Sequence, residues 1–386
     1  MIPIANPEIT EADRQAVGRV LDSGMLASGP EVEKFEEEFA DFIGSDFAVA
    51  TTSGTTALDT AVKACGLEPG DKVITTPFTF IASCNSLLFN QVQPVFVDIE
   101  PDTFNIDPEK VRQALKEEAG IKGILPVHLF GQPAAMQELQ KLAQEQDLVI
   151  IEDAAQAHGA AQQGQRVGSF AQAGIFSFYP TKNMTTGEGG MLVTSEPEVA
   201  EKARKIINHG RAGRYRHDML GHNYRSTDIA AALGREQLKR LPDYNKKRRE
   251  NARYLKDRLA ELEWLTLPVE KRENYHVYHQ FTVRVNSSAI NNPNTQNNPS
   301  SNPETIQAAA ELRDDFVEHL QAAGVGAGIY YPMPAHQQPL YQERGFQDCH
   351  CPEAEKAARE VVSLPVHPAL TTDDLDKIVA AVKSFN

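Results

Sequence analysis

Short apolar runs rich in β-forming residues alternate with amphipathic helical stretches from about residue 30 to residue 240. The runs are bounded by Gly, Pro, Asp or Ser, and they read DFAVATTS, DKVITTP, QPVFVDI, IKGILPVHL, DLVIIEDAA, AGIFSFYP and GGMLVTS. Between them lie GTTALDTAVKACG, PEKVRQALKEEAG and AMQELQKLAQEQ, in which apolar residues recur at positions i, i+3 and i+4. This order predicts an α/β fold, with a mostly parallel sheet covered by helices on both faces.

The composition of the chain changes after about residue 240. The helix TDIAAALGREQLKRL is predicted to end near Pro242, and a strongly charged stretch then leads to a predicted strand, YHVYHQFTVRV. Further on, ELRDDFVEHLQAAG predicts a helix, VGAGIYYP a strand, and TDDLDKIVAAVKSF a final helix capped by Thr371 or Thr372. We therefore predict a large domain over 1–240 and a smaller C-terminal α+β domain over 241–386. Residues 286–304 are rich in Asn, Pro and Ser, which predicts a mobile surface insertion.

The net charge of the chain indicates which kinds of ligand it can bind. A formal net charge of −15 argues against a nucleic-acid binder, because phosphate contacts along a duplex need a basic face. A small anionic ligand remains compatible, since backbone amides and a few local cations can hold a phosphate. The start of the chain has no basic leader with an apolar core, and no apolar run is long enough to span a bilayer, so we expect a cytoplasmic protein.

The four cysteines, Cys65, Cys84, Cys349 and Cys351, do not resemble a disulfide framework in a chain of 386 residues. Cys349 and Cys351 flank His350, and metal binding is the alternative interpretation there. The close pair-plus-pair spacing of a structural zinc site is missing, so we expect reduced thiols and no metal.

Informative residues follow several of the predicted strands, and the carboxyl ends of such strands are where α/β sheets bind ligands. Ser53, Gly54 and Thr55 begin a helix whose free backbone N–H groups and dipole suit a phosphate. Many helices begin with such a cap, so this motif alone also fits a purely structural role. After DLVII come Glu152 and Asp153, where a carboxylate could cap a helix, bind a metal or keep a heterocyclic nitrogen protonated.

Lys182 follows an apolar strand and precedes a turn that contains Gly187, Gly189 and Gly190. A lone lysine on a loop is usually a solvated surface charge, but this one lies where a tight turn would hold it close to the strand ends. A phosphate site, a carboxylate and a lysine at neighbouring strand ends are together the groups that bind pyridoxal 5'-phosphate. Asp153 would keep its pyridine nitrogen protonated, and Lys182 would hold the cofactor covalently and carry protons as base and acid.

Five motifs in order, SGTTAL, TPFTF, EDAAQAHG, SFYPTKNMTTGEGG and LGHNYRSTDIAAALG, make the chain similar to the DegT/DnrJ/StrS type of sugar aminotransferases. This family belongs to the fold type I pyridoxal-phosphate enzymes, and the resemblance runs from about Ile4 to the carboxyl end, including SLPVHPALT. It implies a homodimer with shared active sites and a ping-pong transfer of an amino group, with L-glutamate as donor, onto a keto sugar of a nucleotide-linked hexose. One branch of the family has histidine in place of the lysine and dehydrates its substrate; Lys182 therefore favours an aminotransferase.

The resemblance also implies roles for single residues. Gly54 and Thr55 would bind the cofactor phosphate through their amides and Ser177 through its hydroxyl, while Asp153 would pair with the ring nitrogen. Phe80 would stack on the ring, with Phe78 as the alternative, and Gln156 would reach the phenolic oxygen. Asn223 would reach the phosphate from the neighbouring subunit, unless it is only a turn residue. The residues that match the substrate-pocket regions are Arg225, Tyr331 and His336.

Three questions stay open at the level of sequence. TTGEGG after the lysine is more similar to members that act on 4-keto sugars than to those that act on 3-keto sugars. A cyclitol or another ketone without a nucleotide is an alternative acceptor. A regulatory protein that keeps the fold without catalysis is an alternative of a different class, because fold does not dictate function.

Overall fold

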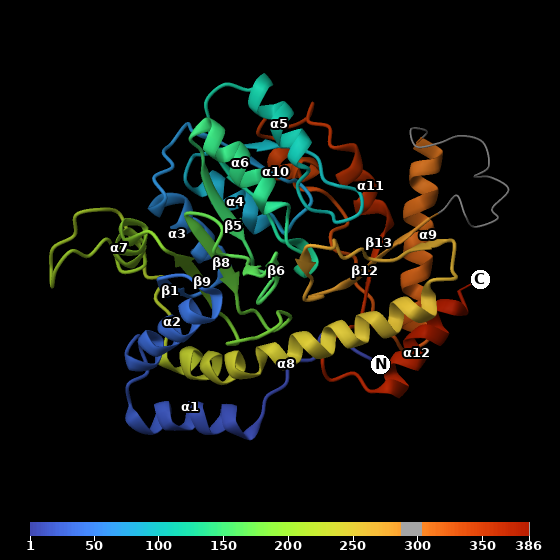
Figure 1. The fold of residues 1–386 in the computed structure, drawn as a ribbon, viewed down its shortest axis with the longest axis horizontal. Coiled ribbons are helices and arrows are strands. Elements are labelled where there is room, and N and C mark those ends of the chain that lie inside the picture. Colours follow the sequence, from blue (N-terminus) through green and yellow to red (C-terminus); the bar gives the residue numbers. More distant parts are fainter. Residues whose placement is uncertain (287–302, 386) are drawn as a thin grey trace.

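A seven-stranded sheet forms the centre of the computed structural model, which describes residues 1–286 and 303–385 (Figure 1). Its strand order is β1-β9-β8-β5-β4-β2-β3. The strands are β1 Phe47–Thr51, β2 Lys72–Thr75, β3 Gln93–Phe96, β4 Ile121–Leu125, β5 Val149–Asp153, β8 Ala173–Ser177 and β9 Gly190–Thr194. All neighbouring pairs are parallel except those of β9, which runs antiparallel to β1 and β8. The predicted mostly parallel sheet is confirmed.

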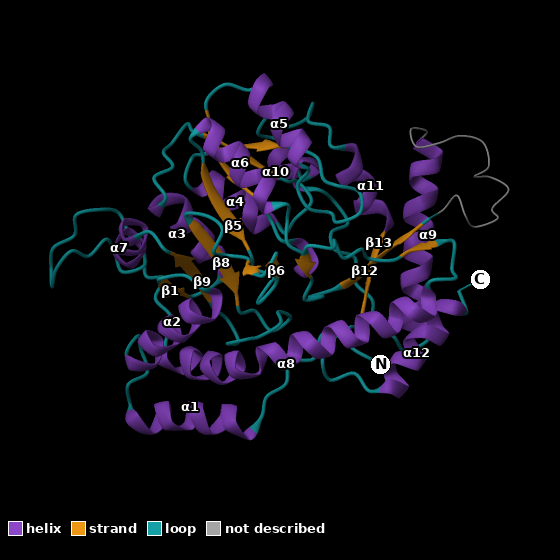
Figure 2. Ribbon diagram, in the orientation of Figure 1, coloured by secondary structure: helices purple, strands orange, loops and turns teal. Residues whose placement is uncertain are grey.

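Helices cover both faces of this sheet (Figure 2). Successive strand residues point to opposite sides, and because apolar residues lie on both sides, each face must pack against helices. Ile150 belongs to the apolar cluster on one face and Ile151 to the cluster on the other. The first cluster packs on α2 Pro30–Ile43, α5 Pro108–Glu117 and α6 Met136–Gln146. The second packs on α3 Gly54–Ala64, α4 Ile81–Phe89, α7 Pro197–Ile206 and α11 Pro352–Glu360. The predicted α/β layering is therefore present, with a buried sheet between two helical layers.

A smaller antiparallel sheet lies in the C-terminal part of the chain, in the order β10-β12-β13. Its strands are β10 Leu265–Thr266, β12 Phe281–Val285 and β13 Val361–Leu364, and it packs on α9 Pro303–Ala322 and α12 Thr372–Lys383. Thr371 caps α12, as one of the two predicted alternatives. Ile2 pairs with Val325, so the N-terminus lies beside this C-terminal part (Figure 1). The remaining elements are α1 Glu11–Ser23, α10 Pro339–Gln342, the 3-10 turns Leu129–Gly131 and Ala335–Gln337, and a small sheet of β6 Ala161–Gln162, β7 Gln165–Arg166 and β11 Asn274–Tyr275.

The helix that was predicted to end near Pro242 instead continues as α8, Asp228–Leu259. Proline removes one backbone hydrogen bond from a helix, but burial on both sides of it outweighs that loss. Leu241 packs in the apolar cluster of the large sheet, and Leu255 packs in that of the C-terminal part. The boundary proposed at 240/241 therefore falls inside one helix, and the division into two domains remains a proposal.

Two further predictions concern the C-terminal part. VGAGIYYP was wrongly predicted as a strand, because its backbone makes only isolated bridges, one from Val325 to Ile2 and one from Gly328 to Ser363. Glycines at Gly324, Gly326 and Gly328 weaken strand formation there. Most of the predicted insertion at 286–304 lies outside the described residues. No helix in the described ranges has the length and apolar character needed to cross a membrane.

Candidate active site

A pocket of about 500 Å³ opens at the carboxyl ends of the parallel strands. Four of these strands contribute residues at or just after their carboxyl ends: Thr55 after β1, Phe80 after β2, Asp153 at the end of β5 and Lys182 after β8. Segments from both ends of the chain close the pocket; they include Ile4, Ala5, His279, Gln280, Tyr330 and Tyr331. Lys182 and Asp153 therefore line the same cavity, which is where residues that bind one cofactor ring must lie.

The start of α3 forms one wall of the pocket. Ser53 caps the helix by accepting a hydrogen bond from Thr56 N at 3.2 Å. The amides of Gly54 and Thr55 have no acceptor in the described residues, and both residues line the pocket. Two free N–H groups at the positive end of a helix dipole form a site for an anion such as a phosphate.

Gly54 lies too close to the end of β8 for any larger residue. A Cβ at Gly54 would lie 2.8 Å from Ser177 Cβ. We expect Gly54→Ala to lower the free energy of unfolding by about 1–3 kcal/mol, because either the strand end or the helix start must shift. Thermal or urea unfolding measures this change, and equilibrium binding of pyridoxal phosphate should weaken in parallel.

Gly18→Ala is the matched control for this substitution. Gly18 lies inside α1, and a Cβ there would meet nothing within 4 Å. Alanine should stabilise this helix by about 0.5–1 kcal/mol relative to glycine. Equal stability changes in the two variants would contradict the close approach of α3 to β8.

Asp153 is a buried carboxylate that lines the pocket. Ser83 Oγ donates a hydrogen bond to its Oδ2 at 2.7 Å, and the Ala155 amide donates to its Oδ1 at 3.1 Å. Burial raises the pKa of Asp153, whereas these hydrogen bonds and the nearby Lys182 charge lower it. The carboxylate is thus held in one orientation, with a cation as its electrostatic partner.

Lys182 is half-buried and lines the same pocket. Burial lowers the pKa of its amine to about 8, and the charge of Asp153 opposes this shift only in part. Its backbone amide donates to Tyr179 O at 2.9 Å, which closes the turn after β8. An amine with this pKa is available as a nucleophile and as a base near neutral pH.

Phe78 and Phe80 lie in different environments. Phe78 is buried in the apolar cluster beneath the pocket, whereas Phe80 is 55 % exposed and lines the pocket. The Phe80 ring lies 6.1 Å from the Tyr331 ring, centroid to centroid. Gln156 joins this wall by donating from Nε2 to Tyr331 Oη at 3.0 Å and accepting from Phe130 N at 2.8 Å. Phe80 is therefore the phenylalanine of the pair that can face a bound ring.

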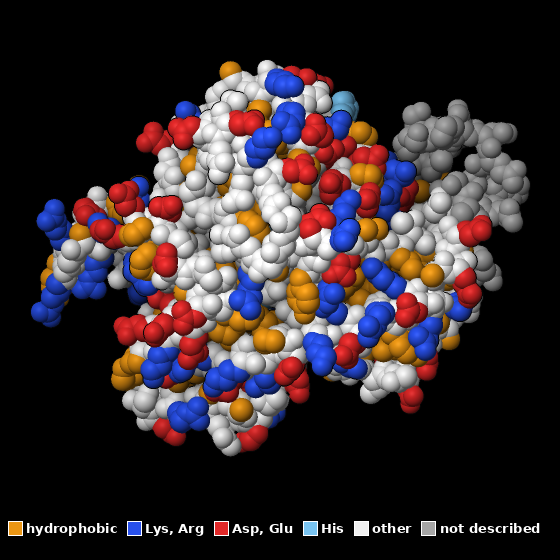
Figure 3. Space-filling model, viewed as in Figure 1, with side chains coloured by type: hydrophobic (Ala, Val, Ile, Leu, Met, Phe, Trp, Pro, Cys, Tyr) orange, Lys and Arg blue, Asp and Glu red, His pale blue; other side chains and the backbone are white. Residues whose placement is uncertain are grey.

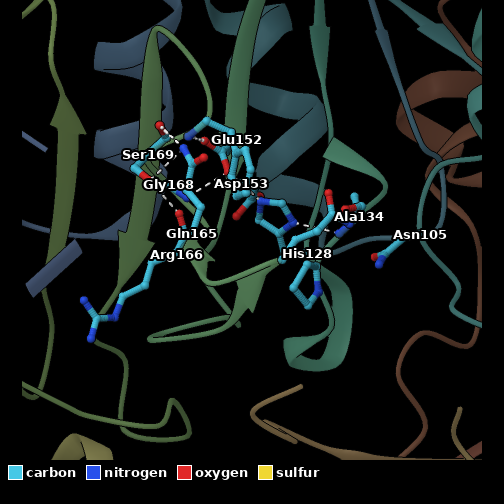
Figure 4. A network of polar contacts seen from close by, with 12 residues as sticks. Asn105, His128, Ala134, Glu152, Asp153, Gln165, Arg166, Gly168 and Ser169 are labelled. Carbon is cyan, nitrogen blue, oxygen red and sulfur yellow. Dashed lines mark hydrogen bonds and ion pairs between the residues drawn. The ribbon is translucent and has the colours of Figure 1, made fainter. Parts of the chain in front are cut away.

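A network of polar contacts surrounds Glu152, the residue before Asp153 (Figure 4). His128 Nδ1 accepts from Ala134 N at 3.0 Å, so His128 Nε2 carries the proton and donates to Glu152 Oε2 at 3.0 Å. Glu152 also accepts from the amides of Gly168 at 2.7 Å and Phe170 at 2.8 Å. These contacts tie the end of β5 to the loops beside it. Glu152 is thus a structural carboxylate, whereas its neighbour Asp153 faces the pocket.

Two predicted substrate residues lie outside the pocket of their own chain. His336 is buried, with its Nε2 3.3 Å from Glu355 Oε1 and its ring 6.2 Å from the Phe96 ring. His336 is therefore not among the residues that line the cavity of this chain, and its role in the substrate pocket stays a prediction. Arg225 donates to Asn208 Oδ1 at 2.8 Å, and it is not among the pocket residues either. Tyr331 alone of the three predicted substrate residues faces the cavity.

Asn223 also lies away from the pocket of its own chain. It is exposed and pairs with Asn208 at the base of the segment between α7 and α8. Its contact with a neighbouring subunit stays a prediction.

Several pocket residues were not singled out from the sequence. Ser83, Tyr179, Glu188, His279 and Tyr330 all line the cavity. Ser83 had a weak signal, because it lies one helical turn after Phe80 in TPFTFIAS. The other four had no local signal that separates them from ordinary loop or strand residues.

The pocket residues fit pyridoxal phosphate as a group. Two unpaired amides and the Ser177 hydroxyl could hold the phosphate, and Asp153, Lys182 and Phe80 line the same cavity. In the parts of the chain that the structure describes, no cluster of three or more His, Cys, Asp or Glu could hold a metal ion. The arrangement suits carbonyl and amine chemistry with an organic cofactor.

Comparison with known proteins gives a consistent result. The model of the DegT/DnrJ/EryC1/StrS aminotransferase family matches residues 7–309 and 294–383. A pleiotropic regulatory protein from Geobacillus stearothermophilus is 38 % identical over 95 % of this chain and 93 % of its own length. A dTDP-3-amino-3,4,6-trideoxy-alpha-D-glucose transaminase from Streptomyces venezuelae is 37 % identical over 99 % of this chain and 94 % of its own length. The solved structure of NtdA from Bacillus subtilis, with bound cofactor PMP, is 30 % identical, with a TM-score of 0.84 over 98 % of this chain and 82 % of that chain.

Proposed function

Because this chain belongs to the DegT/DnrJ/EryC1/StrS aminotransferase family, whose members depend on pyridoxal phosphate, we propose that it transfers an amino group from L-glutamate to a nucleotide-linked keto sugar. The observation that carries the proposal is the single pocket that contains Lys182, Asp153 and the free amides at the start of α3. The regulatory name of one relative does not favour the alternative, because this chain retains Lys182, Asp153 and Ser177 together. A yellow purified protein would support catalysis, and a colourless one that binds no cofactor would support the regulator.

The cofactor's phosphate would lie against the amides of Gly54 and Thr55 and the hydroxyl of Ser177. Asp153 would hold a proton on the pyridine nitrogen, Phe80 would stack on the ring, and Gln156 would donate its remaining amide hydrogen to the phenolic oxygen. Bound there, the cofactor supplies an electron sink for the carbanion that forms when a C–H bond next to an amine breaks. Asp153 strengthens that sink because it keeps the ring positively charged.

Lys182 would perform two tasks. Its unprotonated amine would hold the cofactor through the aldehyde, with loss of water, and, once released, it would act as the base and then the acid for the proton on Cα of the donor. The same steps in reverse would deliver the amine to the keto sugar. The two half-reactions would share one pocket, so the keto acid left by the donor must leave before the sugar binds, which is ping-pong order.

The low pKa of Lys182 predicts a pH dependence for cofactor attachment. Only the neutral amine reacts, so the rate of attachment to the unloaded protein should rise about tenfold per pH unit below pH 8 and level off above it. Stopped-flow absorbance over pH 6–10 measures this rate. Nα-acetyl-lysine, treated identically to account for ionisation of the cofactor, should keep rising to about pH 10. A rate for the protein that follows the free amine to that pH would contradict the lowered pKa of Lys182.

The nucleotide would need cations that this pocket lacks. Lys182 is the only Lys or Arg among the described residues that line the cavity, and it is committed to the cofactor. A diphosphate needs charge-assisted hydrogen bonds from further basic groups. We therefore propose that a second copy of the chain supplies them and that the enzyme is a homodimer with shared active sites.

The segment between α7 and α8 is suited to this role. It projects from the body of the protein, and Lys and Arg side chains gather on it (Figure 3). It contains Arg211, Arg214 and Arg216, and Tyr215 is 84 % exposed. Asn223 and Arg225 lie at its base, which supports the proposal that they approach the partner's pocket rather than their own.

A complementation experiment tests the shared site. Lys182→Ala and the triple variant Arg211→Ala, Arg214→Ala, Arg216→Ala should each be inactive as homodimers. After unfolding and joint refolding, half of the dimers should be mixed and one site in each of these should be intact, so about a quarter of wild-type activity should return. Mixed dimers without activity would contradict site sharing, and a monomer in analytical ultracentrifugation would contradict the dimer.

The sugar and the amino donor need an activity panel. We propose a 4-keto hexose because of TTGEGG after the lysine, although the Streptomyces venezuelae relative carries a 3-amino sugar in its name. With glutamate as donor, 4-keto and 3-keto nucleotide sugars, a keto cyclitol and simple keto acids should be compared by kcat/KM. Faster turnover of the cyclitol or of the keto acids would contradict the nucleotide-sugar assignment.

A further inference from the structure

His279 is a pocket-lining imidazole that the proposed chemistry leaves without a role. It precedes β12, and it is 6 % exposed. Its Nδ1 lies 3.3 Å from Oδ1 of Asn183, the residue that directly follows Lys182. The ring is therefore tied to the same loop that carries the reactive lysine.

A chain of side-chain amides determines which ring nitrogen of His279 carries the proton. Asn245 Nδ2 donates to the His158 carbonyl at 2.8 Å, so Asn245 Oδ1 is the oxygen that accepts from Asn183 Nδ2 at 2.8 Å. Asn183 Nδ2 also donates to the Val277 carbonyl at 3.2 Å. Backbone carbonyls accept only, so Asn183 Oδ1 is an acceptor and His279 Nδ1 must be its N–H donor.

The other nitrogen of the ring, Nε2, is left with a lone pair. Burial lowers the pKa of His279 well below its usual value, and the charges of Lys182 and Arg248 act in the same direction, so the ring is neutral. Nε2 makes no hydrogen bond in the described part of the chain. It is also absent from the buried polar atoms that lack a partner, so it is accessible from the cavity. Since the ring lines the cavity, Nε2 offers that lone pair to whatever the cavity holds.

The backbone of His279 is also held in place. Arg248 Nη1, from α8, donates to the carbonyl of Tyr278 at 3.2 Å and to that of His279 at 3.1 Å. Contacts from α8 fix the backbone of His279, and the contact with Asn183 fixes its ring. The direction of the Nε2 lone pair is therefore set by these two parts of the chain. A group that is pre-oriented in this way contributes to recognition at little entropic cost.

We propose that His279 Nε2 accepts a hydrogen bond from a hydroxyl group of the sugar and so helps to select the acceptor substrate. This inference rests on the proposed function. Nε2 is a hydrogen-bond acceptor. A hydroxyl group can donate to it, whereas an ionised carboxylate has no hydrogen to donate. The carboxylates of an amino-acid donor must therefore face elsewhere, and His279 distinguishes the sugar half-reaction from the donor half-reaction.

Substitution separates this role from a structural one. His279→Leu removes the acceptor, whereas His279→Gln can keep a carbonyl oxygen as acceptor. In calorimetry on the pyridoxamine-phosphate form, the Kd for the nucleotide sugar should rise about tenfold in His279→Leu and stay within about threefold in His279→Gln. The rate of the glutamate half-reaction should stay within about twofold of wild type in both.

His276→Leu is the matched control. His276 is buried in the same segment, where its Nδ1 accepts from Tyr278 N at 3.0 Å, and it does not line the pocket. It should lose stability in thermal unfolding without a change in the Kd for the sugar. An equal rise of the Kd in both leucine variants would overturn the proposal, because it would show a general effect of packing.

The tautomer gives a readout that does not depend on activity. In the unloaded protein, with its 11 histidines labelled with ¹⁵N, the His279 signals, assigned by their loss in His279→Gln, should show a proton on Nδ1 and none on Nε2 between pH 6 and 9. A proton on Nε2, or an unchanged sugar Kd in His279→Leu, would overturn this inference alone. A wild-type enzyme that binds no nucleotide sugar would instead overturn the proposed function together with it.

Discussion

Replacement of Lys182 by alanine should lower kcat by about 10⁴-fold or more, because it removes both the covalent anchor of the cofactor and the group that moves the proton. Steady-state assays with glutamate and the best nucleotide sugar of the panel measure the loss. In the wild type, borohydride should fix the cofactor's mass on the peptide that contains Lys182, and in the variant it should not. Appreciable transamination by Lys182→Ala would contradict the mechanism.

The fold should survive this substitution. Lys182 is half-buried, and desolvation lowers the pKa of its amine to about 8, so loss of the amine removes a charge that the pocket disfavours. The thermal midpoint should therefore change by only a few degrees. Lys182→Arg is a second variant to compare with Lys182→Ala. It keeps a cation beside Asp153, but arginine does not form the covalent bond with the cofactor aldehyde that lysine forms. It should be as inactive as Lys182→Ala, and an active arginine variant would show that charge alone suffices.

Asp153→Asn should lower kcat by about 10²–10³-fold while the cofactor still binds. The amide keeps the size of the carboxylate but supplies no negative charge to hold a proton on the ring nitrogen, so a preorganised electrostatic contribution is lost. The asparagine can still accept from the Ala155 amide, which keeps the loop in place. Single-turnover absorbance at the cofactor band, together with kcat, measures the effect. A variant with near wild-type kcat would exclude Asp153 as the partner of the ring nitrogen.

Two neighbouring substitutions serve as controls for Asp153→Asn. Ser83→Ala removes one hydrogen bond to the carboxylate and should lower kcat by about tenfold, with little further loss when it is combined with Asp153→Asn. Glu152→Gln weakens a buried structural network and should lower the free energy of unfolding by about 1–3 kcal/mol. Its kcat per folded molecule should stay within a few-fold of wild type. A reversed pattern, with Glu152 needed for kcat and Asp153 only for stability, would contradict the assignment of the two carboxylates.

The strands of the central sheet and the motifs at their ends were predictable because their signals are local. A run such as DLVIIEDAA shows its burial on both faces in its own composition, and β5 occupies Val149–Asp153 within it. Parallel strands place their carboxyl ends at one edge, so Lys182 and Asp153 could be expected together without any knowledge of packing. The family resemblance then supplied roles for single residues that spacing alone could not supply.

Other features were not predictable because they depend on contacts between distant segments. Pro242 argued for a helix end, yet α8 continues because apolar clusters on both sides of it bury its faces. His336 follows a stretch that enters the pocket at Tyr331, but it lies against Phe96 and Glu355 instead. Neither outcome has a signature within a few residues of the position concerned.

The sequence by itself determined the α/β class, the strand ends that carry chemistry and the pairing of a lysine with a carboxylate, since periodicity and turn residues act over a few positions. Only the tertiary structure decided that Phe80 rather than Phe78 faces the cavity, that Ser83 orients Asp153 and that His279 presents a lone pair to the ligand. These properties arise where side chains far apart in the chain meet in a buried space. There, hydrogen-bond partners and solvent exclusion are set by the packed whole and not by any single segment.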